Sequence, residues 1–114
     1  MPLLKIQTNV VMDADAKKTL VAEASRAVAA LLGKPERYVM VSLESALAMA
    51  FGGDTSPLVY MELKSIGLPQ SRTAEFSKAL CGLISTALGV PADRTYIEFA
   101  DAQGSMWGWN GGTF

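Results

Sequence analysis

The sequence predicts an α/β fold in which two strand–helix–strand units share one four-stranded mixed sheet. Segments with the two-residue apolar alternation of strands are interspersed with segments whose apolar residues recur every three or four positions, as in amphipathic helices. The order strand, helix, strand occurs twice, and the tetrapeptide LGKP at 32–35 returns as LGVP at 88–91. We therefore expect one domain, residues 1–114, with pseudo-symmetric βαβ halves and both helices on one face of the sheet.

The first unit begins with an alternating strand at 3–8. Asp13 marks the start of a helix, because a carboxylate stabilises the positive end of the helix dipole. Gly33 marks its end, because glycine readily adopts the left-handed conformation that closes many helices. The segment YVMVSLE at 38–44 is the predicted second strand. The apolar stripe of the helix is expected at Leu20, Ala24, Ala27, Val28 and Leu31.

The second unit repeats this order. The segment LVYMELKSI at 58–66 is the predicted third strand, and a helix is expected over 70–89 with Gly89 at its end. The segment RTYIEFA at 94–100 is the predicted fourth strand, and the aromatic, glycine-rich tail at 106–114 is compatible with a small additional strand. The apolar stripe of the second helix is expected at Phe76, Leu80, Leu83 and Ala87.

This arrangement leaves one face of the sheet without helices. Half of the residues are apolar, which is more than one small core readily hides. We therefore expect apolar residues on the uncovered face, and contact with further copies of the chain to bury them.

The composition excludes several classes of site. The chain has no histidine and a single cysteine, Cys81, which removes Ser-His-Asp and Cys-His catalysis, histidine-ligated zinc and internal disulfides. The formal net charge is −1 without any basic run, so no nucleic-acid partner is expected. No apolar stretch is long enough to cross a membrane, and no signal peptide is recognisable, so we expect a cytoplasmic protein.

Several short motifs follow one another along the whole chain. They are MP at the start, TNV at 8–10, GKP at 33–35, FGG at 51–53, SIG at 65–67, LCGL at 80–83, DRTYIEF at 93–99 and GWNGGTF at 108–114. In this order they resemble the macrophage migration inhibitory factor family, within the tautomerase superfamily. The resemblance implies a homotrimer with three sheets around a central channel and active sites at the subunit interfaces. It also implies keto–enol tautomerase activity on a small keto acid such as phenylpyruvate, without a cofactor.

The resemblance assigns the catalytic role to Pro2. It implies that the initiator methionine is removed, so that Pro2 becomes a terminal secondary amine acting as acid and base. An ordinary terminal amine titrates at roughly 7.7–8.0, and burial lowers this pKa, so that a neutral, proton-accepting amine is available at neutral pH. The alternative is that Pro2 is only a small residue that permits removal of the methionine.

Three further residues are assigned to the substrate by the resemblance. Lys34 would bind the substrate carboxylate, although a lysine near a helix end is more commonly a solvated residue placed there by the helix dipole. Ser65 and Ile66 end the third strand, where unpaired backbone groups can meet a ligand. For Ile66 only the main chain is expected to act, with its side chain in the core.

The remaining site residues lie near the C-terminus. Tyr96 and Glu98 share one strand face, and the resemblance implies that both reach the site from a neighbouring subunit. Glu98 stands where the best-known mammalian member has asparagine, so it is expected to affect substrate preference, either by weakening anion binding or by holding Lys34 or the Pro2 ammonium. Trp107 is expected at the rim of the pocket, but aromatic residues in such a tail also serve subunit contacts.

Two other functions remain compatible with the sequence. One is a cytokine-like or host-interaction protein that leaves cells by an unconventional route and binds a receptor. The other is a related proline-dependent reaction, such as decarboxylation or hydration.

Overall fold

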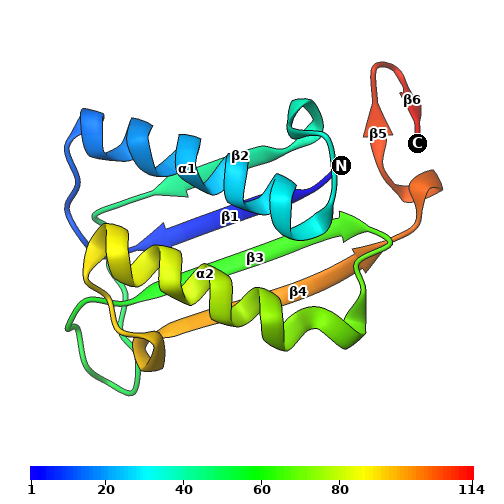
Figure 1. Ribbon diagram of the computed structural model, residues 1–114. Helices are drawn as coiled ribbons and strands as arrows, with labels where there is room; N and C mark the ends of the chain where they lie inside the picture. The colour runs from blue at the N-terminus through cyan, green and yellow to red at the C-terminus, as the bar shows by residue number, and fades with distance from the viewer.

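The computed structural model describes residues 1–114 and contains the two expected βαβ units, followed by a short hairpin. The elements in chain order are β1 (Leu3–Thr8), α1 (Ala14–Leu32), β2 (Met40–Glu44), β3 (Val59–Ile66), α2 (Thr73–Leu88), β4 (Thr95–Ala102), β5 (Gly108–Trp109) and β6 (Gly112–Thr113). The strands β5 and β6 pair with each other and stand apart from the main sheet (Figure 1).

The main sheet has four strands in the order β2-β1-β3-β4. Each βαβ unit contributes a parallel pair, β1 with β2 and β3 with β4, and the two units meet where β1 and β3 run antiparallel. Both helices cover the same face (Figure 1). The predicted mixed α/β sheet is therefore confirmed. Neither helix combines the length and the hydropathy needed to cross a membrane.

The helices begin and end at residues whose chemistry explains the boundary. The side chain of Asp13 accepts a hydrogen bond from the Ala16 amide at 2.8 Å, which satisfies a free N–H of the first turn of α1. Gly33 and Gly89 close the two helices with φ values of 62° and 69°, a region that costs other residues strain. These glycines fix the direction in which the chain leaves each helix.

The core lies between the sheet and the helices. Its helix residues include Leu20, Ala24 and Val28 from α1 and Phe76, Leu80 and Ile84 from α2. The predicted stripe of α2 is wrong at Ala87, which is exposed, whereas Ile84 is fully buried. Both residues fit a helical spacing from Leu80, and the packing against the sheet selects the larger side chain.

Three boundaries differ from the predictions. Tyr38 lies in a 3-10 turn, Glu36–Tyr38, so β2 begins two residues later than expected. A second such turn, Gln70–Arg72, precedes α2, which begins at Thr73. The strand β4 continues to Ala102 because it pairs with β3 along its whole length. The two turns are closed by local hydrogen bonds between residues three apart, whereas the extension of β4 depends on its pairing with another strand.

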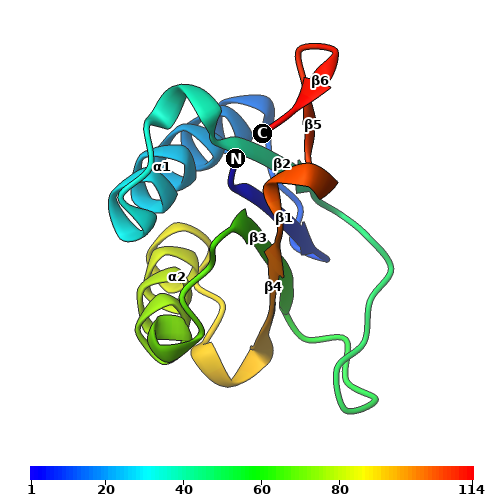
Figure 2. The same cartoon turned by 90° about the vertical axis from the view of Figure 1, so that its right-hand side faces the viewer.

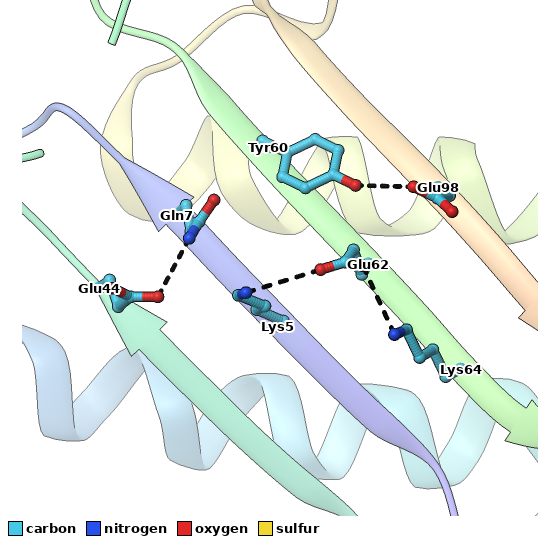
Figure 3. Close-up of polar contacts among 7 residues, drawn as sticks. All are labelled: Lys5, Gln7, Glu44, Tyr60, Glu62, Lys64 and Glu98. Carbon is cyan, nitrogen blue, oxygen red and sulfur yellow. Dashed lines mark hydrogen bonds and ion pairs between the residues drawn. The ribbon is translucent and has the colours of Figure 1, made fainter. Parts of the chain in front are cut away.

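The face of the sheet without helices is polar in its middle (Figure 3). Glu62 lies between Lys5 and Lys64, with nitrogen–oxygen distances of 3.8 and 3.6 Å, and Gln7 donates a hydrogen bond to Glu44. The prediction of an apolar uncovered face is therefore wrong for this region. Large exposed apolar side chains are found instead towards the strand ends and in the C-terminal tail: Met40, Tyr96, Met106, Trp109 and Phe114.

Candidate active site

A cavity of about 350 Å³ lies beside the N-terminus. Three segments that are distant in the sequence form it, and Figure 2 shows the N-terminus and the C-terminal hairpin on the same side of the molecule. The lining residues are Met1, Pro2, Leu3, Arg37, Tyr38, Val39, Met40, Trp107, Gly108, Trp109 and Phe114. Most of these are apolar or aromatic, as is usual for a small-molecule pocket.

Pro2 is buried at the head of β1. Its carbonyl accepts a hydrogen bond from the Met40 amide at 3.0 Å, which ties it to the start of β2. A proline before the first strand residue removes no ladder hydrogen bond, so this position tolerates it. Burial and, to a smaller extent, the charge of Lys34 lower the pKa of the Met1 amine that precedes it. An amine at the position of Met1 is therefore shifted towards its neutral form.

Lys34 follows the left-handed Gly33 at the end of α1. Its amide donates to the carbonyl of Ala29 at 3.1 Å, and its Nζ donates to the carbonyl of Ile66 at 3.3 Å. The ammonium forms no ion pair with a carboxylate of the same chain. Lys34 and Ile66 thus lie together near the N-terminal amine, and the charge of Lys34 remains available to an anion.

Ser65 and Trp107 have different surroundings. Ser65 is 1% exposed, and its hydroxyl donates a 3.4 Å hydrogen bond to the carbonyl of Ile66, so its side chain does not reach the cavity. Trp107 lines the cavity together with Trp109. Trp109 packs edge-on to Tyr38 and stacks on Phe114, with ring centroids 5.6 and 5.3 Å apart. The tail therefore forms an aromatic wall.

Arg37 is a lining residue that the sequence analysis missed. Its guanidinium lies 4.7 Å from the centroid of the Tyr38 ring, and it is the charged side chain that lines this cavity. Its position three residues after Lys34, in the turn Glu36–Tyr38 that links α1 to β2, is the signal that would have found it. The cavity therefore has two cationic groups nearby.

Tyr96 and Glu98 do not meet Pro2 within one chain. Tyr96 is opposite Tyr60, which is opposite Gln7 in the register of the sheet. Gln7 is five residues from Pro2 in β1, which corresponds to about 17 Å of extended strand. The Tyr96 ring lies instead against Phe51, at a centroid distance of 4.5 Å, beside a second, apolar cavity of about 430 Å³.

Glu98 has a polar partner on the open face of the sheet. Its carboxylate accepts a 2.8 Å hydrogen bond from the Tyr60 hydroxyl (Figure 3). This bond stabilises the neutral phenol and, with burial and Glu62, raises the pKa of Tyr60 to about 12. Within one chain, Glu98 therefore holds neither Lys34 nor the N-terminal amine.

The chain matches known proteins along its whole length. The family model described as "Macrophage migration inhibitory factor (MIF)" matches residues 1–114. Macrophage migration inhibitory factor from Xenopus laevis is 35% identical, and the homolog from Brugia malayi is 39% identical; each alignment covers 100% of this chain and 99% of the relative.

Solved structures agree with this. The crystal structure of a macrophage migration inhibitory factor homologue from Prochlorococcus marinus has a TM-score of 0.92 with 52% identity, covering 98% of each chain. The protein from Trichinella spiralis has a TM-score of 0.91 with 34% identity, covering 98% of this chain and 99% of that one. The fold, the order of the motifs and the full-length matches lead to one conclusion: this chain belongs to the macrophage migration inhibitory factor family.

Proposed function

We propose that this chain is a cofactor-independent keto–enol tautomerase that uses the amine of Pro2 as its acid and base. The observation that carries this proposal is the position of Pro2, buried at an aromatic cavity with the unpaired ammonium of Lys34 nearby. Once Met1 is removed, the secondary amine of Pro2 lies in surroundings that lower the pKa of an amine. A neutral amine is the form that accepts a proton.

The proposed reaction moves one proton within a small keto acid such as phenylpyruvate. The Pro2 nitrogen removes a proton from the carbon beside the ketone, and the electron pair forms the enol double bond. The Pro2 ammonium then returns this proton to the carbonyl oxygen, which leaves the amine neutral again. The reverse sequence ketonises the enol. Lys34 binds the substrate carboxylate, the Ile66 main chain lies beside it, and Trp107 contacts the body of the substrate. No oxidation state changes, so the step needs no redox cofactor.

We further propose that the site is completed by a second copy of the chain in a homotrimer. Tyr96 and Glu98 lie too far from Pro2 to join it within one chain. The exposed aromatic surface around Tyr96 and the exposed tail residues Trp109 and Phe114 offer apolar area that subunit contacts would bury. Ser65, being buried, would support the Ile66 main chain from behind.

The test is ketonisation of enol phenylpyruvate by the wild type and by Pro2→Gly, after mass spectrometry has verified the N-terminus of both. Clear wild-type activity that falls about 100-fold or more in the variant is the expected result, since a positioned acid–base group contributes roughly 10²–10⁴-fold. Equal activity in both would make Pro2 a processing residue only. Inactivity of both would reject the tautomerase and favour the receptor-binding alternative.

A further inference from the structure

The loop between β2 and β3 is attached to the body by one arginine. Arg94 is the last residue of the 3-10 turn Ala92–Arg94, directly before β4. Its guanidinium donates to four backbone carbonyls of this loop: Phe51 at 2.9 Å, Asp54 at 3.0 Å, Ser56 at 2.8 Å and Pro57 at 3.4 Å. A single side chain thus holds a segment 37–43 residues away in the sequence.

Two observations indicate that Arg94 determines the conformation of this loop. Arg94 forms no ion pair with a carboxylate, although it is half-buried. The loop that it holds contains Gly52 and Gly53, both with positive φ, whose conformation would otherwise be easily lost. The planar fork of an arginine presents five donors in fixed directions, which suits several carbonyls at once. The contact therefore specifies the shape of the loop.

The loop in turn supports an aromatic contact. The guanidinium of Arg94 lies 5.3 Å from the centroid of the Phe51 ring, and the same ring contacts the Tyr96 ring at a centroid distance of 4.5 Å. Tyr96 is 64% exposed and lies two residues after Arg94 in the chain. Arg94 thus holds Phe51 by both its carbonyl and its ring, and Phe51 limits where the Tyr96 ring can lie.

We propose that Arg94 is a positioning residue that sets the Tyr96 ring for the substrate bound at a neighbouring copy's Pro2. This inference rests on the proposed function, because Tyr96 acts on a substrate only in that assembly. Arg94 itself touches neither the substrate nor the amine. Its loss should therefore weaken binding of an aromatic substrate without changing the proton transfer.

The experiment compares wild type with Arg94→Ala and Arg94→Lys on enol phenylpyruvate. Arg94→Ala should raise KM about three- to tenfold, the range of an aromatic contact, while kcat and the amine pKa seen in the pH–rate profile stay unchanged. Arg94→Lys should raise KM less than Arg94→Ala does, because lysine keeps the charge. It should still raise KM above that of the wild type, because lysine has one nitrogen for four carbonyls. If Arg94→Ala does not fold, Arg94→Lys carries the test.

A matched control and a double variant separate positioning from general damage. Arg72 also lies over a phenylalanine, 5.0 Å from the Phe76 ring, but it is away from the loop, so Arg72→Ala should leave KM unchanged. In a Tyr96→Ala background, Arg94→Ala should have no further effect on KM, since the two residues act through one contact. An equal rise in KM in both backgrounds would overturn the proposal.

A readout independent of activity keeps the two proposals apart. The Tyr96 ring signals in the NMR spectrum should shift in Arg94→Ala, and the amides of residues 52–56 should exchange faster. An inactive wild type would reject the proposed function. The positioning of Tyr96 by Arg94 would then be tested only by the Tyr96 ring signals and the amide exchange of residues 52–56. Unchanged Tyr96 signals and unchanged exchange would overturn the positioning role, whether or not the protein is active.

Discussion

The two ends of the sheet differ in what they offer to a ligand. The end that carries Pro2 has a cavity of about 350 Å³, a buried N-terminal segment and the cations Lys34 and Arg37. The end that carries Tyr96 has an apolar cavity of about 430 Å³ and the Phe51–Tyr96 pair, held in place by Arg94. Both ends carry aromatic side chains, but the cavity at the first end has cationic groups at or near it, whereas the cavity at the second end has no charged lining residue.

Under the proposed function, the two ends of one chain have different roles: one supplies the amine and the cations, and the other supplies an aromatic contact. Most of the large exposed apolar side chains lie at one or other of these ends or in the tail, while the sheet surface between them carries charged pairs. Under the proposed function the two ends are half-sites of one active site, and because they lie too far apart to meet within one chain, a second copy would complete them. Substitutions at each end of the sheet test whether two copies share one site.

The largest expected loss belongs to Pro2→Gly, and mixing it with a second impaired variant tests the shared site. Pro2→Gly replaces the rigid secondary amine of proline by the primary amine of a flexible glycine and is expected to lose about 100-fold in kcat/KM. Tyr96→Ala loses the aromatic contact and about tenfold. Co-expression of the two, with different tags to isolate mixed assemblies, should restore activity because some sites pair an intact Pro2 with an intact Tyr96. In randomly mixed closed rings, about one quarter of the sites are intact.

Activity of the mixture no higher than the mean of the separate variants would contradict a shared site. The double variant Pro2→Gly/Tyr96→Ala mixed with wild type is the matched control, because it regenerates no site that the wild type lacks. Light scattering on the same samples verifies that both variants assemble equally.

Lys34→Ala is expected to have the next largest effect, at the Pro2 end alone. Loss of a hydrogen bond to a charged group costs about 1.5–3 kcal/mol, so KM for a keto acid should rise roughly 10–100-fold. The variant also changes the pH–rate profile. Lys34 lowers the pKa of the nearby amine by its positive charge, so its removal raises that pKa and moves the limb for the neutral amine to higher pH.

Kinetics over a pH series measure both effects. Lys18, an exposed lysine of α1, provides the control, and Lys18→Ala should change neither KM nor the pH limb. A limb that stays in place in Lys34→Ala would show that the lysine charge does not reach the amine.

Local sequence predicted the order of elements, the start of α1 and the glycines that close both helices, because these depend on neighbouring residues. The Asp13 cap and the left-handed Gly33 and Gly89 follow from residue type and position alone. Pro2, Lys34 and Ile66 were predicted as one site through family resemblance, and the structure brings them to one end of the sheet. Their roles in catalysis stay predictions.

The features that the sequence did not reveal depend on contacts between distant segments. The choice of Ile84 over Ala87 for the core depends on how α2 rotates against the sheet. Arg37 faces the cavity because the C-terminal tail closes over it, and Arg94 holds a loop about 40 residues earlier in the chain. The polar character of the open face could have been predicted, since Lys5 and Gln7 alternate with buried residues along β1. The high apolar content of the whole chain led instead to the expectation of an apolar face.

The smallest effects are expected from alanine substitutions at the two glycines that close the helices, one at each end of the sheet. Gly33 and Gly89 both have positive φ, and an added Cβ would meet no atom within 4 Å at either position. Alanine at either site therefore costs only backbone strain, and the free energy of unfolding should fall by about 1–2 kcal/mol in both variants. Denaturant unfolding measures this free energy. Clearly unequal losses of stability in the two variants would indicate that backbone strain at the substituted residue is not the only cost at one of the helix ends.

The kinetic consequences of these two substitutions should differ. Gly33 directly precedes Lys34, whose amide and Nζ bonds depend on the direction of the chain at that point. A small shift there displaces the cation, and we expect Gly33→Ala to raise KM about two- to threefold, a fraction of the effect of removing the charge. Gly89 is followed by the fully buried Val90, which anchors the chain, so Gly89→Ala should leave KM unchanged. A rise in KM in both variants would mean that strain passes between the two ends of the sheet, and the half-sites would then not be independent.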